Sequence, residues 1–410
     1  MTSNTPQGSQ LLKTRYLYDP IKFFNLQKLF PAESNLKRKK LRAFLEKNVS
    51  PVISKNVEQA TFPHEIIPYL KQLQICGIEG GGFGCPKLTG IDKAIALYEL
   101  SRIDPGLSTF YIVQCGLVIK TIELLANEAQ KRKYLKKLCD FDMIGCWGLT
   151  EPDYGSDATG LETKATPVKG GYLLTGTKKW IGNASFSDIM VIWAKNTQTN
   201  QIQGFIVDSK ARGVSVVDIQ RKLALRTVQN GIIALDDVFV GENDRLEKAV
   251  DFQSGVNQIL GSSRMFVPWL ALGIIAGVYE TAVKYQRNRV QFGAPLASYQ
   301  INQEKLVRIL GNFNASFLKC WRLLVLNEKG RATASHAAEV KSWVTRIGRE
   351  AASLGRELLG GNGILVENYV MRALLDMEAI YTYEGTYDVN SLVTGRDISG
   401  IPAFKPSFKL

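Results

Sequence analysis

The sequence predicts an α+β protein with an N-terminal helical domain (residues 1–142), a central antiparallel β domain (143–245) and a C-terminal four-helix bundle (246–410). Three observations lead to this prediction. Apolar residues recur at helical spacing through most of the first part. Short β-branched runs separated by turn residues begin at Met143, and long amphipathic stretches return after Arg245. No alternation of strand and helix patterns is visible, which argues against a Rossmann-type sheet.

Breaks and caps delimit the N-terminal helices. Helical spacing indicates three helices in this part. The first covers residues 91–103, the second runs from the break at Pro105–Gly106 to residue 125, and the third runs from the break at Asn127 to residue 139. The glycine-rich segment Gly80–Gly84 follows no strand and precedes no Lys-Ser/Thr pair. We therefore interpret it as a loop between helices and not as a phosphate-binding loop.

The spacing of apolar residues changes from a helical to a strand pattern where the central part begins, and back to a helical pattern where the C-terminal part begins. The expected strands are GYLLTG, DIMVIWAK, GFIVD, VSVVDI and GIIALDDVFV, and the expected helices are 252–289, 300–329, 332–359 and one after Thr386. The nearly uncharged run Met265–Tyr279 is 15 residues long, which is shorter than the roughly 20 that a membrane span needs. We expect it to be a buried core helix and expect no membrane span.

Composition limits the classes of function. Hydrophobic residues make up 45% and charged residues 22% of the 410 residues, as in a folded globular protein. The net charge of +13 suits nucleic acid, a membrane surface or ligands with several phosphates, and does not choose among them. Two histidines are too few for a His-based zinc site, so acid-base chemistry falls on carboxylates. Six cysteines without a C-x-x-C pair fit a reducing compartment.

Three segments carry candidate chemistry, and each also has a plain structural interpretation. Leu149–Asp157 (LTEPDYGSD) is either turn chemistry or a ligand cradle. Trp180 near a strand end is either core packing or a surface for a planar cofactor. Tyr381–Thr386 (YTYEGT) is either a helix-start turn or a carboxylate, Glu384, in an apolar wall that raises its pKa toward that of a general base.

Five ordered motifs, LTEPDYGSD, KKWIGN, RVQFGAPLASYQ, LLGGNG and YEGT, resemble the acyl-CoA dehydrogenase and acyl-CoA oxidase superfamily of flavoproteins over residues 62–404. Within it the chain is most similar to plant-type peroxisomal short-chain acyl-CoA oxidases, with glutaryl-CoA dehydrogenases next. The resemblance implies FAD as cofactor, a homodimer or homotetramer, and Glu384 as the base that removes the α-proton of an acyl-CoA. A backbone N–H and a cofactor hydroxyl stabilise the nascent enolate in that family.

The resemblance also implies the binding residues. Within one subunit it assigns FAD contacts to Trp147, Gly148, Leu149, Thr150, Ser156, Trp180, Ile181, Gly182, Thr386, Tyr387 and Asp388. From a neighbouring subunit it assigns Arg289, Phe292, Gln300, Glu357, Leu358, Leu359, Gly360 and Gly361. It assigns acyl-CoA contacts to Ser108, Thr109, Ser156, Asn257, Arg264, Gly385 and Phe404. No metal site is expected.

Two departures from the family pattern refine the expectation. Gly182 stands where dehydrogenases have a threonine that bonds flavin N5, which favours oxygen as electron acceptor and hydrogen peroxide as product. Ser108 stands where glutaryl-CoA dehydrogenases have an arginine, so a distal carboxylate would be buried unpaired. The sequence thus predicts an acyl-CoA oxidase for plain short or medium acyl chains in fatty acid β-oxidation.

Alternatives remain at this stage. The first is an acyl-CoA dehydrogenase that reduces electron-transfer flavoprotein. A nucleic-acid-associated flavoprotein is supported only by the basic charge, and a catalytically silent subunit is disfavoured by the retained Glu384. The terminal Phe408-Lys409-Leu410 is an atypical peroxisomal address, and the N-terminus with Lys13 and Arg15 has the character of a weak mitochondrial presequence. We expect a peroxisomal location, with the mitochondrial matrix as the alternative.

Overall fold

The computed structural model describes residues 18–401. The expectations that involve Phe404, the terminal Phe408–Leu410 and the segment with Lys13 and Arg15 lie outside the described residues.

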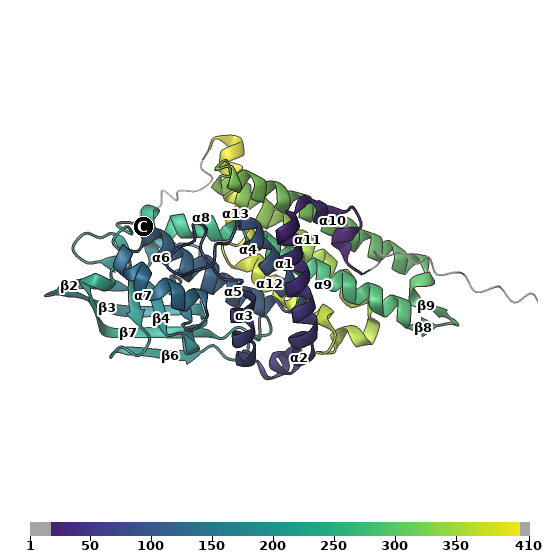
Figure 1. Cartoon of the computed structure of the whole chain (residues 1–410), viewed down its shortest axis with the longest axis horizontal. Coiled ribbons are helices and arrows are strands. Elements are labelled where there is room, and N and C mark those ends of the chain that lie inside the picture. The colour runs from purple at the N-terminus through teal and green to yellow at the C-terminus, as the bar shows by residue number, and fades with distance from the viewer. Residues whose placement is uncertain (1–17, 402–410) are drawn as a thin grey trace, which may run out of the picture.

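The described chain is helical, then β, then helical, as expected (Figure 1). The first helices are α1 (Ala32–Asn48), α2 (Ser50–Gln59), α3 (Ile67–Leu73), α4 (Gly90–Ile103), α5 (Pro105–Tyr111), α6 (Lys120–Leu125) and α7 (Glu128–Cys139). The strands are β1 (Gly145–Gly148), β2 (Lys164–Val168), β3 (Gly171–Gly182), β4 (Ile189–Asn196), β5 (Ile202–Asp208), β6 (Val214–Asp218) and β7 (Asn230–Gly241). The last part holds α8 (Gln258–Arg264), α9 (Val267–Asn288), the hairpin β8 (Val290–Gln291) and β9 (Ala294–Pro295), α10 (Gln300–Glu328), α11 (Ala334–Leu358), α12 (Tyr369–Thr382) and α13 (Tyr387–Ser399).

Side-chain caps set the ends of the N-terminal helices. Thr89 and Asp92 form a capping box at the start of α4, and Asn127 and Gln130 form one at the start of α7. The Asp104 side chain accepts the N–H of Leu107 and caps α5. Between α5 and α6 the helix widens into the π-type turn η4 (Ile112–Ile119), a winding that is often found at functional sites. The predicted helices of this part are therefore confirmed, with an unexpected change of winding.

The strands form one seven-stranded sheet in the order β1-β4-β2-β3-β7-β6, with β5 paired to β4. All five expected strands are present, but the expectation of a purely antiparallel unit needs correction, since β4 runs parallel to β1 and to β2. The sequence pattern also missed β1 and β2. Gly145 in β1 packs so closely on Val118 that a Cβ atom would lie 2.5 Å from it. Tertiary packing, more than β propensity, therefore positions this strand.

The C-terminal helices pack against one another and against α4. The expected helix 252–289 is divided into a π-type turn η8 (Gln253–Asn257), α8 and α9, because Pro268 begins a new helix near its first turn. Helix α12 and the β8–β9 hairpin were not predicted. The core of α9 is almost wholly buried, as expected for the apolar run at its start.

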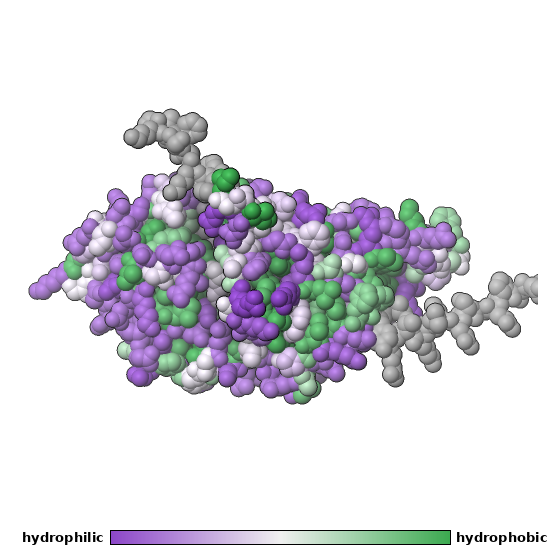
Figure 2. Space-filling model, turned by 90° about the horizontal axis from the view of Figure 1, so that it is seen from above, coloured by the Kyte–Doolittle hydropathy of each residue, from purple (hydrophilic) through white to green (hydrophobic). Residues whose placement is uncertain are grey.

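Two stretches, Pro105–Leu125 and Gln253–Asn288, are long and apolar enough to cross a membrane by length and composition alone. Their most apolar windows are 78% and 89% buried inside the fold, which is how core helices behave. The face shown in Figure 2 is mostly hydrophilic, with apolar patches between polar residues.

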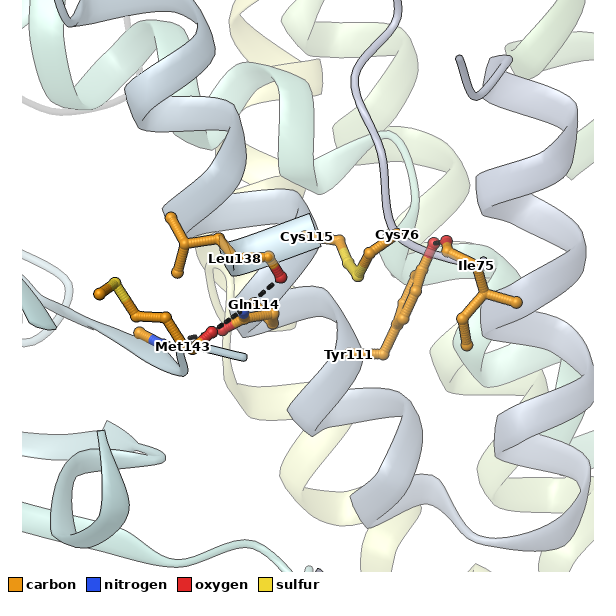
Figure 3. The surroundings of a disulfide bond; sticks show 8 residues. Ile75, Cys76, Tyr111, Gln114, Cys115, Leu138 and Met143 are labelled. Carbon is orange, nitrogen blue, oxygen red and sulfur yellow. Dashed lines mark hydrogen bonds between the residues drawn. A yellow bond between two sulfur atoms is a disulfide. The ribbon is translucent and has the colours of Figure 1, made fainter. Parts of the chain in front are cut away.

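A disulfide joins Cys76 to Cys115, whose Cα atoms are 5.9 Å apart (Figure 3). Next to it, the Tyr111 hydroxyl donates to the carbonyl of Ile75 over 2.7 Å. Both contacts tie the loop after α3 to the helix α5–η4. The expectation of reduced thiols is wrong for this pair. The two cysteines are 39 residues apart, and only the packing of the folded chain brings them together, so the sequence pattern did not reveal the bridge. The other cysteines within residues 18–401 are free: Cys85, Cys139, Cys146 and Cys320.

We expect reduction of this bridge to lower the free energy of unfolding by about 3 to 4 kcal/mol, because an open chain gains conformational entropy when it unfolds. Urea denaturation with and without dithiothreitol measures the difference. The double variant Cys76→Ser/Cys115→Ser should match the reduced protein and be insensitive to the reductant. Identical midpoints of the wild-type protein in both buffers would contradict the bridge.

Candidate active site

Glu384 lies in the short turn between α12 and α13, in a left-handed conformation with φ 55°, followed by Gly385 with φ 88°. For a residue with a Cβ atom this conformation costs roughly 1 to 2 kcal/mol and persists only where the surroundings hold it. Two residues of α8 do so. The Ser263 hydroxyl donates to the Glu384 carboxylate over 2.9 Å, and Arg264 Nε donates to the Glu384 carbonyl over 2.9 Å.

The surroundings also set the acidity of this carboxyl. Burial raises the pKa of Glu384 above its ordinary value, because the charged form loses hydration. Arg264, the hydrogen bond from Ser263 and the ammonium of Lys341 act in the opposite direction and only partly compensate. A carboxylate with a raised pKa is a better proton acceptor near neutral pH than an ordinary glutamate.

Trp180 is turned outward by an irregularity in the pairing of β3 with β7. The register shifts between Lys178 and Ile181, and Trp180 takes a left-handed φ of 64°. Its indole is 53% exposed, although most large apolar side chains of the sheet are buried. Bulges of this kind redirect side chains beside active sites. The arrangement leaves a flat apolar ring uncovered at the sheet surface and argues against the core-packing interpretation.

The segment Leu149–Asp157 lies next to this bulge. The N–H of Lys179 donates to the carbonyl of Thr150 over 2.8 Å. Beneath the loop, Lys178 Nζ lies 2.8 Å from a carboxylate oxygen of Glu151, and both side chains are buried. Glu151 further accepts the N–H groups of residues 162 and 163. The structure therefore brings together two motifs that are about thirty residues apart, through an ion pair that the sequence analysis did not anticipate.

One helix connects the sheet residues to Glu384. The hydroxyl of Thr109 in α5 lies 3.3 Å from that of Tyr383, the neighbour of Glu384. Four residues later, Val113 in η4 lies where a Cβ atom on Gly182 would be 3.3 Å away. Residues four apart share a helix face. The candidate base and the Trp180–Gly182 strand end therefore flank the same face of α5–η4.

A small cavity lies between η4 and α8. Ser263 lines it and also holds the carboxylate. Its other lining residues are Lys93, Leu97, Tyr111, Ile112, Cys115, Gly116, Lys120, Ser262 and Phe266. The two lysines are buried and paired with Glu79 at 3.1 and 3.3 Å. The cavity thus lies between Ser263, which holds the candidate base, and an ion-pair cluster.

The residues predicted to contact a neighbouring subunit gather elsewhere. Arg289, Phe292 and Gln300 flank the β8–β9 hairpin, and Glu357–Gly361 end α11 nearby, where Lys305 pairs with Glu357 at 2.8 Å. Figure 1 places this hairpin at the end of the molecule opposite the sheet. Phe292 is 97% exposed. Within one chain these residues cannot belong to the site at Trp180.

The remaining predicted residues differ in how well they fit. Arg264 and Gly385 lie at the Glu384 turn, and Thr386 caps the helix that carries Tyr387 and Asp388. Asn257 and Ser156 are exposed. The Ser108 hydroxyl is buried and donates to the carbonyl of Leu97 over 3.0 Å, and that of Thr109 donates to Pro105, so in this arrangement neither can donate a hydrogen bond to a ligand.

Descriptions of known protein families match three successive parts of the chain. The descriptions "Acyl-CoA dehydrogenase, N-terminal domain", "middle domain" and "C-terminal domain" match residues 31–142, 146–238 and 254–398. A short-chain-specific acyl-CoA dehydrogenase of Megasphaera elsdenii is 29% identical, covering 86% of this chain and 94% of that protein. The CarC subunit of the caffeyl-CoA reductase-Etf complex of Acetobacterium woodii is also 29% identical, over 89% and 97% of the two chains. A glutaryl-CoA dehydrogenase of Mycobacterium smegmatis in complex with FADH2 superimposes with a TM-score of 0.91 and 30% identity, covering 95% and 100% of the two chains.

We expect Lys178→Met to lower the free energy of unfolding by about 3 to 5 kcal/mol, because it leaves the Glu151 carboxylate buried without its cation. Urea denaturation measures the loss. Lys164→Met, at an exposed position of the same sheet, is the control and should change stability by less than about 0.5 kcal/mol. Adding Glu151→Gln to the first variant should recover part of the loss; no recovery would show that the pair is not the cause.

Proposed function

Because this chain belongs to the acyl-CoA dehydrogenase family, we propose that it oxidises short acyl-CoA thioesters to trans-2-enoyl-CoA, with Glu384 as the catalytic base. The observation that carries this proposal is the position of Glu384. It lies in a strained turn and is hydrogen-bonded by Ser263, which also lines a small cavity.

The cofactor is FAD, which accepts the hydride that leaves the β-carbon of the substrate. The residues present fit such a group. The exposed indole of Trp180 offers a flat apolar surface, and Gly182 beside it keeps the strand end free of a side chain. Gly155 in the neighbouring loop has open space where a Cβ atom would stand. These residues would hold the flavin ring against the sheet.

The side chains around Glu384 support removal of a carbon-bound proton. An α-proton of a thioester is only weakly acidic, so the base must be unhydrated and fixed in place. Partial burial reduces the hydration of the carboxylate and raises the pKa of Glu384. The bonds from Ser263 and Arg264 fix it in place. The proton passes to the carboxylate oxygen as the hydride leaves the neighbouring carbon.

The cavity favours a short acyl chain. In this structure it has space for about one water-sized group, roughly 20 Å³, so it would have to widen for any acyl chain and least for a short one. Its walls are aliphatic and aromatic, and it ends near the cluster of Lys93 and Lys120 with Glu79. A long alkyl chain would have to displace these ion pairs, which lie partly buried. The short-chain name of the Megasphaera elsdenii relative agrees with this proposal.

We propose electron-transfer flavoprotein as the electron acceptor, in place of the oxygen that the sequence analysis favoured. The relatives named above are dehydrogenases and a reductase associated with Etf, and none of these is an oxidase. One observation still favours oxygen. Gly182 offers no hydroxyl to the flavin, although Val113 and Val228 leave little extra room beside it. The oxidase is therefore the second candidate.

A homodimer or homotetramer is part of the proposal. The hairpin at the far end of the bundle exposes Phe292 and Arg289, away from the sheet of its own chain. A second copy would bring that end to the first copy's site. The phosphates of FAD and CoA then account for the basic net charge, and no nucleic acid is needed to explain it.

We expect Glu384→Gln to retain yellow bound FAD and to lose turnover of butyryl-CoA by several orders of magnitude, on the order of 10³-fold or more, because an amide cannot accept the α-proton. In the wild-type protein, kcat/KM should rise with pH through a midpoint above that of an ordinary glutamate, since burial raises the pKa of Glu384 and only the ionised form is active. Steady-state rates with an artificial electron acceptor measure both.

The control is Glu378→Gln, which removes an exposed carboxylate of α12 that pairs with Arg349. Its rate should equal that of the wild-type protein. An active Glu384→Gln variant would refute the assignment of the base.

The acceptor and the chain length can be tested in one titration of the purified flavoprotein with butyryl-, hexanoyl- and octanoyl-CoA. We expect anaerobic bleaching of the flavin, fastest with the shortest chain. In air we expect little peroxide, and rapid reoxidation only after electron-transfer flavoprotein is added. Steady peroxide formation without an added acceptor would favour the oxidase, and preference for octanoyl-CoA would contradict the short cavity.

A further inference from the structure

A buried lysine lies directly behind the candidate base. Lys341 is in the middle of α11, with no exposed surface. Its Nζ donates to the carbonyl of Tyr381 over 3.0 Å and to that of Gly385 over 2.6 Å. These two carbonyls lie on either side of Glu384 in the chain. No motif in the sequence marks Lys341.

The contacts of Lys341 complete a set of donors around the turn. The carbonyl of Glu384 itself is bonded by Arg264 from α8, and the carbonyl of Gly385 is also bonded by the buried Asn390 of α13 over 2.7 Å. Three different helices thus hold the turn that contains two successive left-handed residues. Lys341 is the donor that spans the turn from one end to the other.

The charge of Lys341 is a costly feature. Burial lowers the pKa of Lys341 to about 7, against the attraction of Glu384, and Arg264 lowers it further. A methionine would fill the same space without the charge, but it would leave the carbonyl of Tyr381 without this donor. The ammonium group therefore bonds the two carbonyls that flank Glu384, and its charge acts on the carboxylate between them.

We propose that Lys341 is a positioning residue for Glu384. Its ammonium group donates hydrogen bonds to backbone carbonyls on both sides of the base and so fixes where the carboxylate lies. This inference rests on the proposed function, because it concerns the same proton transfer. The charge of Lys341 also favours the ionised carboxylate, together with that of Arg264.

The test compares Lys341→Met, which removes both donors and the charge, with Lys341→Arg, which keeps them. For each variant we would measure bound FAD from its absorbance, the melting temperature, kcat and KM for butyryl-CoA, and the pH profile of kcat/KM. We expect Lys341→Met to retain FAD with a similar KM and to lose roughly 10²-fold in kcat, as expected for a misplaced reacting group. In Lys341→Met the acidic limb of the profile, where kcat/KM rises with pH, should move to higher pH, because the protonated form of Glu384 is no longer disfavoured by a nearby cation.

Lys341→Arg should recover part of kcat and most of the position of the acidic limb. Lys319→Met is the matched control. It removes a partly exposed lysine of α10, which pairs with Glu339 at 2.8 Å, and should behave like the wild-type protein. If Lys341→Met does not fold, Lys341→Gln, which lacks the charge but keeps an N–H donor, takes its place in the comparison of pH profiles.

Three outcomes would overturn the inference. In the first, the uncharged variant has the kcat and the acidic limb of the wild-type protein. In the second, activity falls only in proportion to bound FAD and the acidic limb of the pH profile is unchanged, which would mean that Lys341 only supports the fold. In the third, the arginine variant is as inactive as the uncharged one, with the same limb. A wild-type protein that turns over no acyl-CoA would instead refute the proposed function.

Discussion

The structure depends on holding one glutamate in a backbone conformation that it would not choose. A left-handed turn at Glu384 is maintained by hydrogen bonds from α8, α11 and α13, and none of these helices alone could impose it. The donors come from the short helix α8, the long helix α11 and the helix α13 that follows the turn. Packing of the C-terminal part brings all three to this one turn.

The second constraint is that the turn must face the sheet. Helix α5 and its continuation η4 meet this requirement, because Thr109 meets Tyr383 on the face where Val113 meets Gly182. The π-type winding of η4 and the irregularity in β3 lie at the same junction. Both are local departures from regular geometry, which large packed elements on each side can tolerate. The disulfide at Cys115 and the caps of α4 and α5 stiffen this region further.

Much of this could be predicted from sequence, and the remainder has physical reasons for escaping prediction. The order of helices and strands and the loop at Gly80–Gly84 follow from local periodicity and turn residues, which the sequence displays directly. Strand β1 and the parallel pairing of β4 depend on packing, and helix α12 also escaped the local pattern. The motif at Glu384 was recognisable, but the ion pair of Glu151 with Lys178 and the contacts of Lys341 were not. Each joins residues far apart in the chain, and no local pattern marks either of them.

The separation of the predicted cofactor residues has a consequence for how such a protein could be silenced. In each chain the hairpin with the exposed Phe292 lies at the end of the molecule opposite the sheet, whereas Trp180 is at a strand end beside η4, so the two do not meet within one molecule. If the proposed oligomer completes the cofactor site, dilution below its dissociation constant would release FAD while each chain stayed folded. Because a ligand that binds the folded state stabilises it, the loss would lower the melting temperature as well as the yellow colour of the solution.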